Sequence, residues 1–397
     1  MRTVFVLLAL FLCGCAQEPG EVSLFPSELL SGLKSAYING DEITVEAVNQ
    51  FEDEAARYLR MEPLYVTEKS IVPPSGDKRD YMTLSPYWWP DPEKEGGLPY
   101  VRRDGERNPE VYNYPERENT NLLGEAVRAL ALLYHVTGSE DYAKKCSELI
   151  REWFLNPERG MNPNMNYAQG IPGRAAGRGA GIIDARRFSY AVAVVPLLRG
   201  SMFWSKEDDK AIRKWSEEFL KWMAESENGQ KELMAKNNHG LWYDAIRLMH
   251  LLNLERRDEM VEVVKSSLLP RLDSQIAEDG SLPKELERTL SLHYSTFALE
   301  AIAVAGSLTE FADESVWSYR TSDGRSLEQV LEYLAPYYEN PDKWPFTQIK
   351  PFERERGAQI LYLAGSALGR EDWIELSKRI GLKGEELDLN SLLYFNL

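Results

Sequence analysis

Residues 119–136 read NTNLLGEAVRALALLYHV, and residues 139–154 read SEDYAKKCSELIREWF. The apolar side chains of the first stretch recur at helical spacing and form one broad stripe, made of Leu122, Leu123, Ala126, Val127, Leu130, Leu133 and Tyr134. Gly138, between the two stretches, is the residue type that most often follows the end of a helix. We therefore predict two helices joined by a tight turn, which places them side by side and antiparallel.

The same helical spacing continues almost to the C-terminus. Ser205 to Asp208 have the spacing of a capping box, with Asp in place of the usual Glu or Gln, and a further helical stripe follows them. The other stretches with this pattern are 188–204, 240–254, 258–277, 291–308, 326–337, 356–369 and 371–380. Helices joined by short turns bundle, stack as a solenoid or close into a ring. Because no repeat of fixed period is present, a regular solenoid is disfavoured. We expect an all-α fold, an (α/α) toroid formed as an incomplete barrel of antiparallel helix hairpins.

Two long stretches break the helical pattern. Residues 63–118 are rich in Pro, Gly, Tyr and Trp, and residues 156–185 contain too many glycines and polar residues for a packed helix. Long irregular segments inside a compact domain are often functional. We expect both stretches to form irregular substrate-binding loops.

The composition is that of an ordinary globular protein with an acidic surface. The 397 residues include 63 Asp and Glu against 46 Lys and Arg, for a net charge of −17. Collagen-like, disulfide-stapled and fully disordered classes are excluded, and a general nucleic-acid binder would be basic. A polyanionic ligand therefore needs a local basic site. The segment 160–190 offers one, because it holds four arginines (Arg174, Arg178, Arg186 and Arg187) against the single acid Asp184.

The N-terminus reads MRTVFVLLALFLCGC, with an apolar run that is too short to span a bilayer. Its ending resembles a bacterial lipoprotein cleavage box, so we expect a signal peptide at 1–14, a lipidated Cys15 and a tether at 15–23. The expected location is the bacterial cell envelope, with the protein lipid-anchored in the periplasm or at the outer-membrane surface and no other membrane contact. The alternative is plain secretion with accidental cysteines. Residues 24–397 are expected to form a single domain.

The remaining cysteine and the histidines predict neither a disulfide nor a metal site. Cys146 is the only cysteine after residue 15, and its place in an apolar helical stripe indicates a buried structural thiol. The four histidines lack the spacing of zinc ligands. We expect no metal and no cofactor, although a divalent ion that neutralises a substrate charge stays an alternative.

Two loop motifs are candidates for sugar binding. Residues 80–92 read DYMTLSPYWWPDP, and Tyr87, Trp88 and Trp89 cannot all face inward on a regular element. Exposed aromatic rings stack on sugars; the alternative is that these rings pin the loop to the helical body. In the second loop, Arg178 can hold a carboxylate with two hydrogen bonds, and Gln169 can bond hydroxyl groups. The alternative is that the arginines of this loop pair with acidic neighbours on the surface.

Two further motifs place polar residues at helix entrances. Residues 236–244 read KNNHGLWYD, where Asn238 and His239 put an amide, an imidazole and backbone N–H groups in one small volume. That group can polarise a carboxylate; the alternative is a capping Asn beside a structural His. Residues 283–295 hold Arg288, His293 and Tyr294 at the start of a predicted helix, where they can point into one cleft. A Tyr on a helix is otherwise a common core residue.

Over roughly residues 80–295 the chain resembles the alginate lyase family of helical-toroid polysaccharide lyases. The most specific parts are Asn237-Asn238-His239-Gly240 and Arg288 followed by Tyr294. In that family the Asn and His of this motif, a downstream Arg and a Tyr form the active centre, so the resemblance implies these roles for Asn238, His239, Arg288 and Tyr294. The aromatic loop is similar to the family's substrate-binding segment. The candidate substrate-binding residues are Tyr87, Trp88, Trp89, Gln169, Arg178 and His293.

The resemblance implies β-elimination of an anionic polysaccharide, a 1,4-linked polyuronate, with poly-β-D-mannuronate preferred. Asn238, His239 and Arg288 would neutralise the uronate carboxylate, so that Tyr294 can transfer the proton from C5. Because a phenol with a pKa of about 10 is a poor base, we expect Arg288 and His239 to favour the phenolate. In mannuronate and glucuronate one Tyr serves as base and acid, since both groups lie on one face; in guluronate His239 would be the base.

Three alternatives stay open. Glucuronan suits the same site, since glucuronate differs from mannuronate only at C2. A hydrolase would use paired carboxylates, for which Asp244, Glu285 and Glu287 are available. A glycan-binding lipoprotein would use Trp88 and Trp89 without catalysis.

Overall fold

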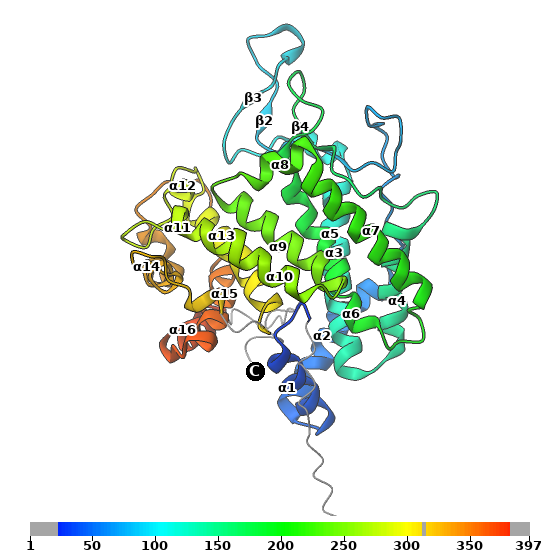
Figure 1. Ribbon diagram of the computed structural model, residues 1–397, viewed down its shortest axis with the longest axis vertical. Helices are drawn as coiled ribbons and strands as arrows, with labels where there is room; N and C mark the ends of the chain where they lie inside the picture. The colour runs from blue at the N-terminus through cyan, green and yellow to red at the C-terminus, as the bar shows by residue number, and fades with distance from the viewer. Residues whose placement is uncertain (1–22, 312–314, 382–397) are drawn as a thin grey trace, which may run out of the picture.

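The computed structural model describes residues 23–311 and 315–381 (Figure 1). The predicted signal peptide, Cys15 and nearly all of the predicted tether lie outside the described residues. The helices are α1 (Ser27–Ile38), α2 (Glu42–Arg60), α3 (Glu116–Thr137), α4 (Glu140–Ile150), α5 (Ala185–Ala193), α6 (Val195–Leu198), α7 (Lys206–Glu225), α8 (Glu227–Leu233), α9 (Asn238–Asn253), α10 (Arg257–Val263), α11 (Leu269–Gln275), α12 (Pro283–Leu286), α13 (Ser291–Leu308), α14 (Leu327–Glu339), α15 (Arg354–Leu368) and α16 (Glu371–Gly381). The strands are β1 (Met82–Leu84), β2 (Trp88–Trp89), β3 (Val101–Arg102) and β4 (Tyr167–Gly170).

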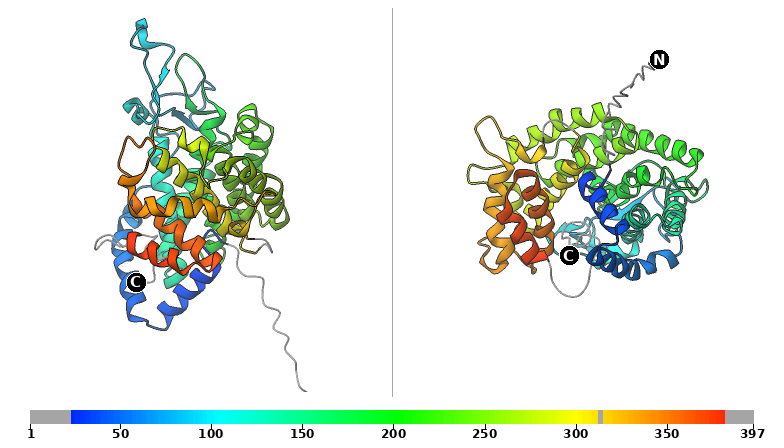
Figure 2. Two further views of the ribbon diagram at one scale, coloured as in Figure 1. Left: turned by 90° about the vertical axis from the view of Figure 1, so that its left-hand side faces the viewer. Right: turned by 90° about the horizontal axis from the view of Figure 1, so that it is seen from below.

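The helices follow one another around an open ring. Seen from below in Figure 2 (right), the chain runs from α2 in blue through α9 in green to α16 in red, and the first and last helices of the ring flank its gap. Neighbours in sequence pack as hairpins, among them α3 with α4 and α15 with α16. The prediction of an all-α fold built as an incomplete (α/α) toroid is confirmed.

Four helices, α3, α5, α9 and α13, pack against one another in a row and carry much of the core. In α9 nearly every side chain is buried, including Leu241, Trp242, Ile246 and Met249. A helix that is apolar on all sides lies inside a protein rather than at its surface. Each fully buried aliphatic side chain contributes about 1.5–3 kcal/mol. The packing therefore gives a rigid support to the N-terminal ends of α9 and α13.

Proline explains why two helices that were predicted as continuous are each broken into two. The predicted helix at 188–204 is two helices, α5 and α6, and Pro196 lies in the first turn of α6. The predicted helix at 258–277 is α10 and α11 with a wide π turn at Val264–Leu268 between them, followed by Pro270. Proline lacks an N–H and clashes with the carbonyl four residues earlier, so the helix must end or widen there.

The helices before residue 117 were not predicted from the sequence pattern. Both α1 and α2 are regular helices, and α2 begins at a well-formed cap, because the Asp41 side chain accepts the Thr44 N–H at 2.9 Å. Both pack against α3. Cys146, as predicted, is a fully buried thiol, and its burial raises its pKa. Over the described residues, no helix combines the length and hydrophobicity that crossing a membrane requires.

The two long loops contain short strands and lie at one end of the ring, at the top of Figure 1. Strand β1 from the first loop pairs in parallel with β4 from the second, and β2 pairs with β3 as a small hairpin. The start of β1 is held by Glu116, which accepts the Met82 N–H and the ammonium group of buried Lys69. The loops are thus less irregular than predicted, and they are joined into one cover over the ring.

Candidate active site

A cavity of about 1170 Å³ lies inside the ring and reaches the loops that cover it. Among the described residues that line it, twelve are basic and five are acidic. The basic ones are Arg102, Arg107, Arg117, Arg128, Arg178, Arg186, Arg187, Lys236, Lys284, Arg288, Lys350 and Arg356. The acidic ones are Asp184, Glu232, Glu287, Glu300 and Glu353. The cavity is therefore locally cationic in a protein whose net charge is −17.

The cavity brings together all but one of the candidate site residues. Those that line it are Tyr87, Trp88, Gln169, Arg178, Asn238, His239, Arg288, His293 and Tyr294. Trp89 is not among the lining residues: its indole N–H donates to the Glu106 carbonyl at 2.9 Å, and the Arg103 guanidinium lies 5.1 Å from its ring centroid. Trp89 thus packs on the β2–β3 hairpin rather than on the cavity.

Asn238 begins α9 and is held by a buried carboxylate. Its backbone N–H donates to Glu285 Oε1 at 2.6 Å, and its side-chain Nδ2 donates to Glu285 Oε2 at 2.7 Å. Asn237 caps the helix by accepting the His239 N–H. Burial raises the pKa of Glu285, and the two bonds from Asn238 oppose that rise. Because both Glu285 oxygens accept bonds from Asn238, this carboxylate fixes the amide rather than facing the cavity as a free acid.

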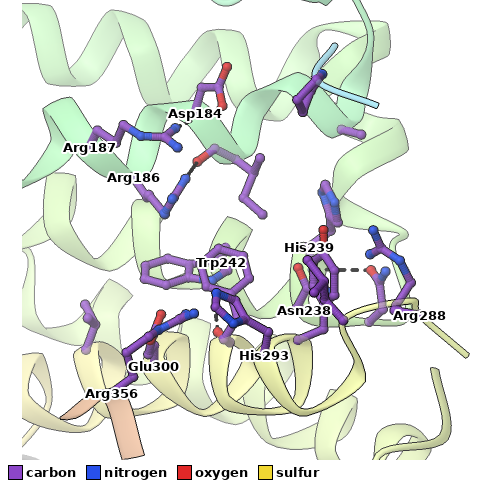
Figure 3. Close-up of a pocket in the computed structure, with 18 of the residues that line it drawn as sticks. Asp184, Arg186, Arg187, Asn238, His239, Trp242, Arg288, His293, Glu300 and Arg356 are labelled. Carbon is purple, nitrogen blue, oxygen red and sulfur yellow. Dashed lines mark hydrogen bonds and ion pairs between the residues drawn. The ribbon is translucent and has the colours of Figure 1, made fainter. Parts of the chain in front are cut away.

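His239 is held by a second buried carboxylate. Its Nδ1 lies 2.6 Å from Oε1 of Glu232, which comes from α8 and is 4% exposed. A carboxylate acceptor favours the tautomer with the proton on Nδ1, which leaves the Nε2 lone pair free. In Figure 3 His239 lies beside Asn238, across from the Arg186 side of the pocket. The imidazole is thus held through Nδ1, and its Nε2 is not used on Glu232.

Arg288 lies in the turn between α12 and α13 and pairs with Asp104 from the loop after β3. Its Nη2 is 2.8 Å from Asp104 Oδ1 and its Nε is 3.1 Å from Oδ2, a two-point ion pair. Burial alone would raise the pKa of Asp104, but the bonds from Arg288 and from the Thr289 N–H hold it well below its usual range. Gly105 has φ +77°, and a Cβ there would come within 2.4 Å of the Thr289 hydroxyl, so only glycine lets this loop approach.

Tyr294 lies in the first turn of α13, with the Arg288 guanidinium carbon 3.7 Å from its ring centroid. Its hydroxyl donates to the Tyr87 hydroxyl at 2.9 Å. The Arg288 charge lowers the pKa of Tyr294 and so favours the phenolate, as expected, but it does not outweigh the opposing effects. Burial raises the pKa of Tyr294 and the nearby Tyr87 adds to the rise, which the Arg288 charge only partly offsets. Arg288 faces the ring and gives two of its nitrogens to Asp104, so Tyr294 is a protonated hydrogen-bond donor.

Gln169 and Arg178 line the cavity and are held in place by hydrogen bonds. Arg178 Nη2 donates to Gln169 Oε1 at 3.0 Å and to the Ser85 hydroxyl at 2.9 Å. Gln169 in turn donates to Asp184 Oδ1 at 3.0 Å. The structure gives Arg178 no ion pair with any described acidic residue, and its Nε is buried without a hydrogen-bond partner there. The alternative of a surface pair with an acidic neighbour is therefore wrong for Arg178.

Trp88 and His293 complete the candidate set. The Arg174 guanidinium lies 5.2 Å from the Trp88 ring centroid, so this ring is held at the cavity mouth beside a cation. His293 lies between the two ends of the pocket in Figure 3. Burial, together with the charges of Arg356 and Lys350, lowers the pKa of His293 to about 4. His293 is therefore neutral at physiological pH.

Sequence reasoning missed the partners that orient these residues. Glu232 and Asp104 carry no local signal, because each reaches its partner from a different element. Glu285 was named only as a candidate hydrolytic acid. Within the two described ranges, no group of three or more His, Cys, Asp or Glu side chains is arranged to hold a metal ion.

Comparison with known proteins gives one family and one fold. Among curated proteins, none is significantly similar to the chain. The crystal structure of an alginate lyase from Bacteroides ovatus matches with a TM-score of 0.88 and 32% identity, over 94% of this chain and 99% of that one. A variant of alginate lyase A1-III complexed with a tetrasaccharide matches with a TM-score of 0.60 and 13% identity, over 95% of this chain and 96% of that one. The structure of alginate lyase A1-III from Sphingomonas species A1 matches with a TM-score of 0.58 and 14% identity, over the same shares of the two chains.

The two A1-III structures show a shared fold, and the family follows from the other matches. The Bacteroides ovatus enzyme exceeds 30% identity over nearly its whole length. The family model described as alginate lyase matches residues 65–344, which include every residue that the resemblance placed in the active centre. The chain belongs to the alginate lyase family.

Proposed function

We propose that this polysaccharide lyase cleaves 1,4-linked polyuronate by β-elimination, with poly-β-D-mannuronate as its preferred substrate. The observation that carries the proposal is the convergence of Asn238, His239, Arg288 and Tyr294 on one cationic cavity. Each of the first three is already oriented by a carboxylate: Glu285, Glu232 and Asp104, respectively. Groups that are fixed before substrate binds need no reorganisation during the reaction.

Neutralisation of the uronate carboxylate is the first task of such a site. Arg288 uses Nε and Nη2 on Asp104, which leaves its Nη1 hydrogens as donors. Asn238 uses one Nδ2 hydrogen on Glu285 and keeps the other. A donor aimed at the charge that develops on the carboxylate in the transition state is worth roughly 3 kcal/mol. These donors would let the C5–H bond release its proton.

Proton transfer is assigned to Tyr294 and His239. Because Tyr294 is protonated, it can donate directly to the O4 leaving group. In mannuronate the two transfers would take place on the same oxygen: as Tyr294 gives its proton to O4 it takes the proton from C5, so it ends protonated. The Arg288 guanidinium carbon, 3.7 Å from the ring centroid, and the rotatable Tyr87 hydroxyl would stabilise the phenolate character that develops between the two transfers. In guluronate, where C5–H and O4 lie on opposite faces, His239 Nε2 would be the base. The proton leaves C5, the C4–O4 bond breaks, and a C4=C5 double bond forms.

The three carboxylates named for the hydrolase alternative are all engaged within the described part of the chain. Asp244 is buried and bonded to Arg271 and Ser267. Glu285 is bonded twice to Asn238. Glu287 lines the cavity but pairs with Lys284 at 2.8 Å. An inverting hydrolase needs one acid and one base on opposite sides of the bond, so these contacts favour elimination.

The test is ultraviolet absorbance during incubation of purified protein with mannuronan, guluronan and glucuronan, each with and without a chelator. Only elimination yields an unsaturated, absorbing sugar. We expect a chelator-resistant rise that is fastest on mannuronan. A fastest rise on glucuronan would transfer the preference to that polymer, and no rise on any of the three would overturn the proposal.

The matched variants are Tyr294→Phe and Tyr319→Phe. Tyr294→Phe should reduce turnover by at least about 10²–10⁴-fold, the usual contribution of a proton-transfer residue. Tyr319 hydrogen-bonds Asp273 away from the cavity, so its loss should leave turnover unchanged. Near-normal turnover by Tyr294→Phe would refute its assignment.

A further inference from the structure

Beyond the proposed catalytic residues, the cavity continues into an inner chamber. We define it by six lining residues: Arg128, Arg186, Trp242, Phe297, Glu300 and Arg356. They come from five helices, α3, α5, α9, α13 and α15. Figure 3 shows Arg186, Trp242, Glu300 and Arg356 at one side of the pocket, Asn238, His239 and Arg288 at the other, and His293 between them.

The two sides of the cavity are separated by about one turn of helix. Trp242 follows Asn238 by four residues on α9, or about 6 Å along the helix axis. On α13, Phe297 follows Tyr294 by three residues and Glu300 follows it by six, or about 9 Å along the axis. This step is of the order of one sugar unit in a 1,4-linked chain. The chamber is therefore one to two units away from the residues proposed to break the bond.

Arg186 is a cation of this chamber without a carboxylate partner. Its one printed hydrogen bond runs from Nη1 to the Ile183 carbonyl at 3.1 Å. The guanidinium carbon lies 5.0 Å from the Phe297 ring centroid and 5.6 Å from that of Trp242, and such cation–π contacts hold it in orientation. The nearest acid in sequence, Asp184, pairs instead with Arg187 at 3.0 Å. The remaining N–H groups of Arg186 can therefore donate to a group bound in the cavity.

The chamber as a whole carries excess positive charge. Arg128 bonds the Gly124 carbonyl and lies over the Tyr190 ring, and among the described residues it has no ion pair. Arg356 pairs with Glu300 at 2.6 Å. Within the chamber as defined, three basic side chains, Arg128, Arg186 and Arg356, stand against the single acid Glu300.

Uncompensated cations inside a protein are costly unless an anion meets them. Burial and the neighbouring Arg187 charge lower the pKa of Arg186 to about 9, so Arg186 is still charged at neutral pH. His293 adds a neutral polar group whose Nδ1 is buried and has no hydrogen-bond partner among the described residues. The excess charge of the chamber and the unused polar nitrogen of His293 at its edge both favour an anionic ligand there.

We propose that the inner chamber binds the carboxylate of a second uronate unit of the polysaccharide chain, with Arg186 as its principal partner and His293 as a further hydrogen-bonding group. The proposal rests on the proposed function, because it assumes a polyuronate substrate. A planar guanidinium with free N–H edges matches a carboxylate in shape as well as charge. Substrates that are too short to fill the chamber then lose this contact.

The experiment measures binding of saturated oligomannuronates of increasing length by calorimetry. Tyr294→Phe serves as the background, since it should bind without cleaving. We expect affinity to rise sharply at the length that first fills the chamber. Arg186→Gln in the same background should lower the affinity for the longer oligomers by at least about tenfold, while the affinity for shorter oligomers stays unchanged. Arg186→Lys, which keeps the charge, should restore part of the lost affinity, and Arg60→Gln, an exposed site on α2, is the control for loss of one positive charge.

Three outcomes would overturn the proposal. One is an unchanged length dependence in Arg186→Gln. Another is an equal loss of affinity at every length in both Arg186→Gln and Arg186→Lys, whether or not a thermal unfolding scan shows a loss of fold. The third is a higher midpoint of thermal unfolding in sulfate when affinity shows no step with oligomer length. That result would indicate a simple anion site. Failure of the proposed function is seen separately, as the absence of unsaturated product from the unmodified protein.

Discussion

Glu232 and Glu285 are buried carboxylates that each orient one polar side chain at the entrance of α9. Glu232 meets His239 Nδ1 at 2.6 Å, and Glu285 holds both the backbone and the side chain of Asn238. Neither faces the cavity as a free acid. Their effect on a reaction would therefore run through the groups that they hold, by fixing a tautomer in one case and an amide in the other.

The role of Glu232 is testable with Glu232→Gln. An amide can donate to Nδ1, which would move the imidazole proton to Nε2 and remove the base, as in a triad whose Asp is replaced by Asn. We expect the initial rate on guluronan to fall by at least about 10²-fold. The rate on mannuronan, where Tyr294 transfers both protons, should fall much less.

The measurement is the ratio of initial ultraviolet rates on the two polymers. Glu227→Gln is the control, because Glu227 lies on the same helix, is exposed and pairs with Lys231. Equal losses on both polymers would assign Glu232 to structure alone and would remove His239 as the base for guluronate.

At the level of elements, Asp184 joins the two loops to the ring. Its carboxylate is fully buried and accepts bonds from Thr83 at the β1 strand, Gln169 on β4 and Arg187 on α5. Burial alone would raise the pKa of Asp184, but the charges of Arg117 and Arg187 and the bond from Gln169 lower it to about 2. A carboxyl group whose folded pKa is depressed stabilises the fold above its ordinary pKa of about 3.9.

We predict that Asp184→Asn lowers the free energy of unfolding by about 2 kcal/mol at neutral pH. The difference between the two proteins should shrink as the pH falls from about 4 to about 2, since the native carboxylate is then protonated too. Denaturant unfolding across this range checks the prediction, with exposed Asp53→Asn as the control. A difference that does not depend on pH would show that packing, not ionisation, is what Asp184 contributes.

The contact between α3 and α5 depends on Gly124. A Cβ at Gly124 would come within 2.6 Å of the Arg187 carbonyl, so the two helices can lie this close only without a side chain there. Since α5 carries Arg186 and Arg187, a shift of this helix would also change the inner chamber.

Gly124→Ala should therefore destabilise the protein by about 1–3 kcal/mol, the usual cost of overpacking. Gly32→Ala on α1 is the matched control, because a Cβ there meets nothing within 4 Å, and it should stabilise by about 0.5–1 kcal/mol. The midpoints of thermal unfolding compare the two. Similar effects of both substitutions would show that α3 and α5 can separate without cost.

On the scale of the whole molecule, the charge distribution is opposite inside and outside. The protein carries a net charge of −17, yet the described residues that line its cavity include twelve basic and five acidic ones. An acidic exterior repels a polyanion on average, and a basic cavity attracts it locally. Short-range attraction inside the cavity must therefore dominate binding.

This arrangement predicts that kcat/KM on mannuronan falls as salt is raised from about 0.01 M to about 1 M, over which the Debye length shrinks from about 30 Å to about 3 Å. We expect kcat/KM to decrease by at least about tenfold, mainly because KM rises. Initial rates at several salt concentrations test this, with thermal unfolding at each concentration to confirm that the fold is intact. Rates that rise with salt throughout would mean that the acidic exterior governs association.

The helical body was predictable because helix periodicity is a local property. Residues three and four apart lie on one face of a helix, so the stripe at 119–136 revealed α3 without any knowledge of its neighbours. The same local rule failed at Pro196 and Pro270, where the apolar pattern continues across a break in the backbone. The helices α1 and α2 were not predicted either, although α2 buries Val48, Phe51 and Ala55 on one face at helical spacing.

The motifs at 237–240 and at 288 and 294 were enough to place the chain in its family, and they named residues that do meet in one cavity. Only the tertiary structure supplied their partners. Asp104 and Arg288 are 184 residues apart in sequence, and Asn238 and Glu285 are 47 apart. Only the folded ring decides that the Tyr294 hydroxyl meets that of Tyr87, and that Arg186 has no carboxylate beside it. Local sequence sets which helices form and which side chains are on offer. The burial and charge around each side chain are sums over residues distant in sequence, so they exist only once the ring has folded around the cavity.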